Sequence, residues 1–148
     1  MSSLYPLRFE PVLKRYLWGG RRLNTVLGKP LPPGEDYAES WEIADHPAGQ
    51  SVVSAGSLKG ATLGELVANH AEALLGKHAP AALAQGRFPL LFKLLDAQKV
   101  LSVQVHPTDA GAAKLTPPDL GKTEAWVVLH AEPGSVVYAG IKRGFDRA

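Results

Sequence analysis

The sequence predicts a mainly β protein, a barrel or jelly roll with one helical insertion. Twelve Pro and fifteen Gly residues divide the chain into short segments, which favours short strands and turns over long helices. Most segments contain apolar residues that alternate with polar ones or run without interruption, as in strands. A helical pattern is confined to residues 62–85. Many short strands separated by turns are typical of barrels and jelly rolls.

Turn-forming sequences separate the expected strands, for example HPAGQ at 46–50 and Pro133-Gly134. The segment 88–96 is almost continuously apolar, so it predicts a buried strand. Lys93 interrupts this run and should therefore face something polar. The expected strands cover residues 7–13, 38–44, 51–56, 88–96, 100–106, 123–130 and 135–140.

The helical insertion begins with a recognisable start signal. Thr62 and Glu65 form the T-x-x-E pattern of a capping box, and Gly76 stands where a helix often ends. Leucine and valine residues between them recur near helical spacing. We therefore expect a helix over 62–75 and a second short helical turn at 79–85.

Length and composition restrict the class of protein. A chain of 148 residues is long enough for one domain with a hydrophobic core, so we expect residues 1–148 to form a single domain. A net charge of +2 is too small to indicate nucleic-acid binding. Without cysteine, any metal must be held by nitrogen and oxygen ligands. No run is apolar enough for a signal peptide or a membrane span, so we expect a cytoplasmic protein without membrane contacts.

One expected strand has a polar face whose residues suit metal binding. In LSVQVHPTD, the side chains of Gln104 and His106 leave the same face, about 7 Å apart. Glu124 opens the next expected strand and can reach the same cavity if the two strands pair. An amide oxygen, an imidazole and a carboxylate together suit a borderline divalent ion such as zinc. The alternative is a strand with one face turned to water.

The sequence GKTE at 121–124 favours the metal site over the water-facing alternative. It places Lys122 beside Glu124, on the same face if the strand begins that early. From the residues alone, Lys122 is better explained as a surface lysine in a loop rich in Gly and Pro.

Five blocks of sequence resemble one family, type I mannose-6-phosphate isomerase. The resemblance extends from about residue 16 to 140, and QVHP followed by GKTE is its most specific part. The blocks are WGG (18–20), ESWEIADHP (39–47), FPLLFKLLDA (88–97), LSVQVHP (101–107) and GKTEAW (121–126).

The resemblance implies a cupin-type jelly roll and a zinc-dependent isomerase. The implied reaction interconverts mannose 6-phosphate and fructose 6-phosphate through a cis-enediol. With this reaction, Lys122 becomes the candidate catalytic residue, because a cation near a metal can stabilise an oxyanion or transfer protons. One zinc per chain would be held by Gln104, His106 and Glu124, and by a second histidine further along the family's sequence. No histidine here occupies that fourth place, and Asp146 looks like a helix N-cap without a helix after it. We therefore expect the N-terminal part of a longer isomerase, with an incomplete jelly roll.

The family blocks also contain candidate substrate-binding residues. Ser102 shares the face of Gln104 and His106, and Trp18 and Glu39 would line the pocket wall. For all three residues the alternative is a structural role in packing, turns or strand hydrogen bonds.

Two other functions compete with the isomerase. An iron-dependent cupin oxygenase is one, although its usual ligand set has more histidine and lacks Gln104. The other is a cupin half-domain that binds a sugar phosphate or a partner without catalysis. If the isomerase activity belongs to a longer protein, we expect this chain alone to be inactive or nearly so. An incomplete sheet would also expose strand edges, so we expect self-association through that edge.

Overall fold

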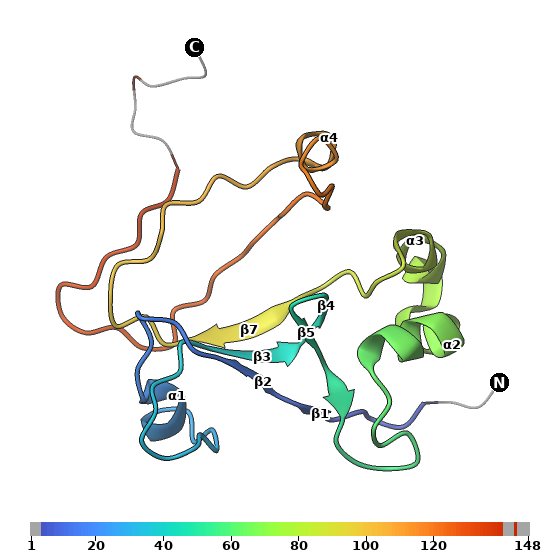
Figure 1. The fold of residues 1–148 in the computed structure, drawn as a ribbon, viewed down its shortest axis with the longest axis horizontal. Coiled ribbons are helices and arrows are strands. Elements are labelled where there is room, and N and C mark those ends of the chain that lie inside the picture. The colour runs from blue at the N-terminus through green and yellow to red at the C-terminus, as the bar shows by residue number, and fades with distance from the viewer. Residues whose placement is uncertain (1–3, 141–143, 145–148) are drawn as a thin grey trace. The chain divides into compact units, whose positions relative to one another are not determined.

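A computed structural model describes residues 4–140 and 144. The chain divides into two compact units, Met1–Ser102 and Val103–Ala148, and each is described by itself. Seven strands and four α-helices are formed by the described residues (Figure 1), so the predicted mainly β class is confirmed. The strands pair in three small sheets, and closure into a jelly roll stays a prediction.

A three-stranded antiparallel sheet is the centre of the first unit. Its order is β2 (Val12–Lys14), β3 (Glu39–Ile43) and β7 (Phe92–Leu95). Ser40 of β3 lies opposite Leu13 on one side and Leu94 on the other, and it is fully buried. The predicted strands at 38–44 and 88–96 therefore exist in shorter form and are neighbours.

Two smaller ladders flank this sheet. Pro11 cannot donate a backbone hydrogen bond, and the predicted strand 7–13 is accordingly divided into β1 (Phe9–Glu10) and β2. β1 pairs with β6 (Val52–Val53). β4 (Asp45–His46) and β5 (Gly49–Gln50) form a hairpin, in which the Ala48 N–H donates to His46 Nδ1 at 3.0 Å.

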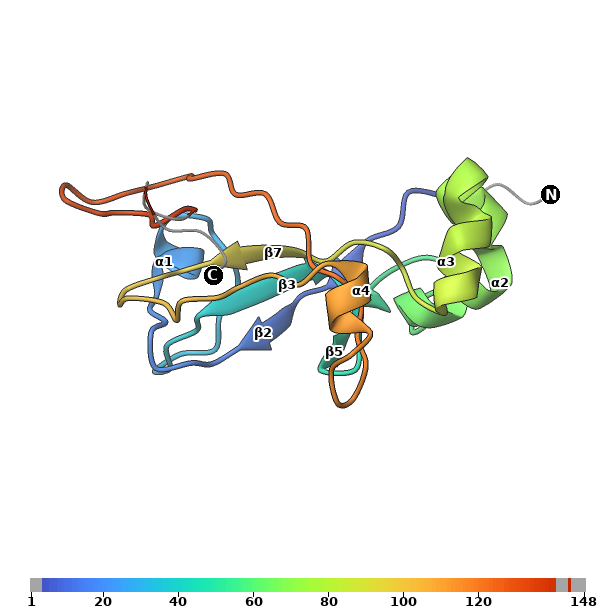
Figure 2. The ribbon, with the colours of Figure 1, turned by 90° about the horizontal axis from the view of Figure 1, so that it is seen from above.

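The predicted helical insertion is confirmed. It consists of α2 (Leu63–Leu75), the 3₁₀ turn η1 (Gly76–His78) and α3 (Ala79–Gln85), with α2 and α3 side by side (Figures 1 and 2). The Glu65 N–H donates to Thr62 Oγ1 at 3.2 Å, and the Thr62 N–H donates to Glu65 Oε2 at 2.8 Å. This reciprocal pair is the capping box that the sequence predicts.

The helix is held to the strands by a small apolar core. Leu63 and Leu66 of α2 are almost completely buried against Val53 of β6. Helix propensity alone seldom stabilises a helix of this length in water, so this packing is what keeps α2 folded. Partly buried apolar side chains surround the core, namely Leu7, Phe9, Ile43, Leu58, Ala61, Leu74 and Phe88.

A buried carboxylate fixes the loop that carries Trp18. Asp96, which follows β7, accepts hydrogen bonds from the Arg22 N–H at 2.6 Å and from the Gln98 side chain. Arg22 begins the short helix α1 (Arg22–Thr25), and the Gln98 N–H donates to the Trp18 carbonyl at 2.8 Å. These bonds join the loop before α1 to the end of β7.

The second unit differs most from the sequence prediction. α4 (Asp109–Ala112) is its one regular element among the described residues, and 100–106, 123–130 and 135–140 form no strand. The prediction of strands there was wrong. Alternation of polar and apolar residues indicates a pleated surface, but a strand also requires a hydrogen-bonded neighbour. Val103 and Val105 are accordingly 97% and 87% exposed. The helix start predicted at Asp146 lies outside the described residues.

Within the residues that the structure describes, no helix is both long enough and apolar enough to cross a membrane.

The capping box predicts a pH-dependent stability. Hydrogen bonds from the Thr62 backbone and side chain to the Glu65 carboxylate lower the pKa of Glu65 below its ordinary value. Glu65 therefore stabilises the fold fully above its unfolded pKa of about 4.3, and this contribution is lost as pH falls through the lower folded value. In thermal melts followed by circular dichroism, the chain should exceed a Glu65→Gln variant in Tm near neutral pH. The difference should shrink below about pH 4. A difference that does not change with pH would contradict this role.

Candidate metal centre

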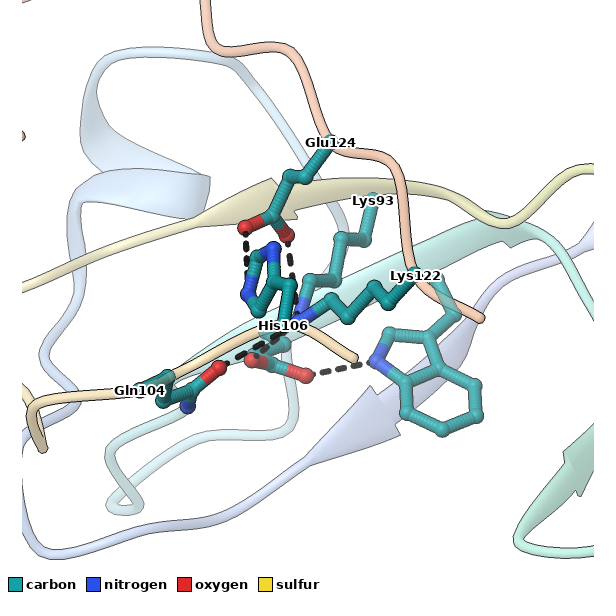
Figure 3. A network of polar contacts seen from close by, with 7 residues as sticks. Lys93, Gln104, His106, Lys122 and Glu124 are labelled. Carbon is teal, nitrogen blue, oxygen red and sulfur yellow. Dashed lines mark hydrogen bonds and ion pairs between the residues drawn. The ribbon is translucent and has the colours of Figure 1, made fainter. Parts of the chain in front are cut away.

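Four polar side chains converge in the second unit, and they come from the two segments that the sequence singled out. His106 Nε2 lies 3.4 Å from Glu124 Oε2. Lys122 Nζ donates to Gln104 Oε1 at 3.2 Å and lies 3.4 Å from Glu124 Oε1. Figure 3 shows these four side chains directed toward one another. The structure therefore brings together Gln104, His106, Lys122 and Glu124, although no strand pairing delivers them.

The backbone brings the two segments together immediately beside these side chains. The Lys122 N–H donates to the Pro107 carbonyl at 3.1 Å. Pro107 follows His106 directly, so this bond places the start of GKTE against the end of QVHP. Proline has no N–H, but its carbonyl remains a full acceptor.

Glu124 is prepared to act as an anion. Partial burial opposes its ionisation, but a hydrogen bond from Trp126 and the charges of Lys122 and His106 outweigh burial and lower the pKa of Glu124. Its side chain is 21% exposed and that of His106 is 29% exposed. A carboxylate that is ionised and partly shielded from water is a suitable ligand for a divalent cation.

The spacing of two of these side chains is compatible with a shared zinc ion. Two ligand atoms on one tetrahedral zinc, each about 2.0–2.2 Å from it, lie roughly 3.3–3.6 Å apart. The separation of His106 Nε2 and Glu124 Oε2 falls in this interval. Among the described residues, no cluster of three or more His, Cys, Asp and Glu side chains can hold an ion. A set of three ligands at this place would therefore have to include a neutral oxygen such as that of Gln104.

The three predicted substrate-binding residues belong to the first unit. Glu39 is 6% exposed and accepts hydrogen bonds from Trp41 Nε1 at 2.6 Å and from Lys93 Nζ at 2.9 Å. Lys93 therefore faces a polar group, as expected. Trp18 stacks on Tyr16, with ring centroids 5.6 Å apart, and Ser102 is the exposed last residue of this unit. Their role in binding substrate stays a prediction.

Three contributions to these sites were not predicted from the sequence. Trp126, which donates to Glu124, stands two residues from it, and that spacing on an expected strand was an available signal. The pairing of Lys93 with Glu39 depends on strand register, because the two residues are far apart in the sequence. The bond that Asp109 accepts from Gly121 is likewise non-local and had no sequence signal.

Comparison with known proteins identifies a family for this chain. The family model of the phosphomannose isomerase type I catalytic domain matches residues 6–124. Mannose-6-phosphate isomerase ManA of Bacillus subtilis is 42% identical over 135 residues, covering 91% of this chain and 40% of that protein. A mannose-6-phosphate isomerase of Streptococcus mutans has the same identity and coverage.

Solved structures give the same result. The crystal structure of mannose 6-phosphate isomerase from Bacillus subtilis matches with a TM-score of 0.65 at 38% identity, over 78% of this chain and 35% of that chain. A variant of phosphomannose isomerase from Salmonella typhimurium matches with a TM-score of 0.59 at 27% identity, over 72% of this chain and 27% of that chain. The chain thus spans about 40% of the length of the curated relatives named above. Since the family model matches most of its residues, the chain belongs to the type I phosphomannose isomerase family.

Proposed function

We propose that this chain supplies the metal-binding part of an aldose–ketose isomerase that interconverts mannose 6-phosphate and fructose 6-phosphate. The observation that carries the proposal is the convergence of Gln104, His106, Lys122 and Glu124. Membership of the family supports the reaction, because relatives that match 91% of the chain are named mannose-6-phosphate isomerases. An iron oxygenase has no comparable support.

A zinc ion would be held by an imidazole nitrogen of His106, the amide oxygen of Gln104 and a carboxylate oxygen of Glu124. Bound there, zinc supplies Lewis acidity that favours polarisation of the sugar carbonyl and stabilises developing negative charge. These three residues leave a fourth position on a tetrahedral ion, which the family resemblance assigns to a histidine further along the sequence of longer family members. One carboxylate and two neutral ligands give the protein a ligand charge of only −1, so the ion would keep most of its positive charge.

Lys122 is proposed to act on the reacting oxygen atoms. Its ammonium lies 3.2 Å from Gln104 Oε1 and 3.4 Å from Glu124 Oε1, and it can donate a hydrogen bond to an oxyanion that forms beside them. The isomerisation moves a proton between C1 and C2 of the sugar, with a cis-enediol between aldose and ketose. Ser102, Trp18 and Glu39 are proposed to contact the sugar phosphate.

A second candidate function is a half-domain that binds zinc or a sugar phosphate without turnover. It requires only the convergence of Gln104, His106 and Glu124, and no group that transfers a proton between C1 and C2. Metal affinity and catalytic rate separate the two candidates, because a half-domain can bind the ion while lacking groups needed for proton transfer.

Zinc binding should depend on the proposed ligands and not on other histidines. Calorimetric titration should show about one zinc per chain, because Gln104, His106 and Glu124 already lie close together. A His106→Ala variant should lose at least tenfold in affinity, since removal of a direct ligand should exceed the effect of an outer-shell change. His130, which contacts Glu132 at 3.3 Å, gives the matched control. Equal losses in His106→Ala and His130→Ala would contradict the ligand assignment.

The isomerase proposal predicts metal-dependent turnover that is slow in this chain alone. Conversion of mannose 6-phosphate to fructose 6-phosphate, followed by phosphorus NMR, should stop on chelation of zinc and return when zinc is restored. Lys122→Met should lower the rate by about 10²-fold or more, the usual range for a group that acts on the transition state. A rate near the enzyme median of about 10 s⁻¹ would refute the expectation of a weakly active chain. Conversion that survives chelation would refute the proposed role of the metal.

A further inference from the structure

A closed loop separates the two segments that carry the candidate ligands. Residues 108–121 form this loop, which begins after Pro107 and ends before Lys122. The Lys122 N–H donates to the Pro107 carbonyl, so the two ends of the loop meet. Within the loop, Thr108 caps α4, Ala112 is fully buried, and the Asp119 N–H donates to the Ala112 carbonyl at 3.1 Å. The loop is thus a compact surface excursion whose two ends lie together.

Asp109 closes this loop with its side chain. The Gly121 N–H donates to Asp109 Oδ1 at 2.9 Å. Asp109 stands three residues after His106, and Gly121 stands three residues before Glu124. The bond therefore joins two residues that each stand three positions from one member of the pair His106 and Glu124. The Nε2 and Oε2 atoms of that pair lie 3.4 Å apart.

Gly121 allows this close approach because it has no side chain. A Cβ atom there would lie 2.6 Å from the Asp109 nitrogen, 2.7 Å from Asp109 Oδ1 and 2.9 Å from the Thr108 carbonyl carbon. Two of these three atoms belong to backbone, so the conflict cannot be relieved by rotating a side chain. The glycine of the GKTE block is therefore required by the contact with Asp109.

We propose that Asp109 is a positioning residue for the candidate metal centre. By accepting the Gly121 N–H, its carboxylate holds Lys122 and Glu124 against Gln104 and His106. The Lys122–Pro107 backbone bond forms at the same place, so Asp109 supplies one of the two hydrogen bonds that the structure shows between residues 107–109 and residues 121–122. The link to zinc rests on the proposed function, whereas the positioning itself does not.

A purely structural alternative for Asp109 is stabilisation of α4. Asp109 is the first residue of this helix, where a negative charge interacts favourably with the backbone N–H groups. The two roles make different demands on the side chain. Positioning requires an acceptor oxygen and tolerates asparagine, whereas the helix-charge role requires the charge.

NMR on the labelled, metal-free chain tests the proposal without reference to catalysis. In Asp109→Ala, the Gly121 amide should exchange with solvent roughly fivefold faster, as expected for loss of one net hydrogen bond. Overhauser contacts between the side chains of Lys122 and Gln104 should weaken as well. Asp109→Asn should preserve both signals. Thr108→Ala is the matched control, because it removes the cap of α4 but keeps the acceptor that Gly121 uses.

Zinc affinity, measured by competition with a chromophoric chelator, gives the second readout. Asp109→Ala should bind zinc about 10-fold more weakly than the unaltered chain, and Asp109→Asn should stay close to it. The proposal is overturned if Asp109→Ala keeps the Lys122–Gln104 contacts, if Asn fails to rescue, or if Thr108→Ala causes the same loss. If neither the unaltered chain nor any variant binds zinc, the proposed function is wrong. The NMR signals then test the positioning role of Asp109 by themselves.

Discussion

The candidate site depends on the contact between residues 107–109 and 121–122. Two hydrogen bonds form there, from the Lys122 N–H to the Pro107 carbonyl and from the Gly121 N–H to Asp109 Oδ1. All four converging side chains lie within three residues of one of these bonds. Without these two hydrogen bonds, only random fluctuations of the loop would bring His106 and Glu124 together. The entropy of loop closure opposes such an encounter. The proposed chemistry therefore requires this backbone contact, because the contact brings the candidate metal ligands together.

The first unit buries charged side chains at its central sheet, and each of them is stabilised by hydrogen-bond partners. Glu39 is stabilised by Lys93 and Trp41, and Asp96 by the Arg22 N–H and the Gln98 side chain. No buried side-chain polar atom lacks a partner among the residues that the structure describes. Removing one partner of such a set leaves a buried group unsatisfied, which is more damaging than replacing the whole set. These bonds link β3 and β7 to the loop that carries Trp18.

How far the sequence predicts this structure depends on the range of each interaction. The capping box of Thr62 and Glu65 acts over three residues, so its pattern was sufficient to locate the start of α2. The convergence of Gln104, His106 and Glu124 was anticipated from strand spacing and residue chemistry, yet the strands expected around them do not form. A ladder needs a neighbouring strand, and a local pattern cannot supply one. Asp109 was missed for the same reason, because its partner Gly121 is twelve residues away.

X-ray absorption spectroscopy of the zinc-loaded chain can show whether Gln104, His106 and Glu124 share one ion. A shared ion should have a first shell of nitrogen and oxygen atoms at about 2.0–2.2 Å, with scattering from a single imidazole. That imidazole signal should disappear in a His106→Ala chain loaded with the same metal. If the spectrum of this variant keeps an imidazole signal, or if that of the unaltered chain requires several imidazoles, these three residues do not share one ion.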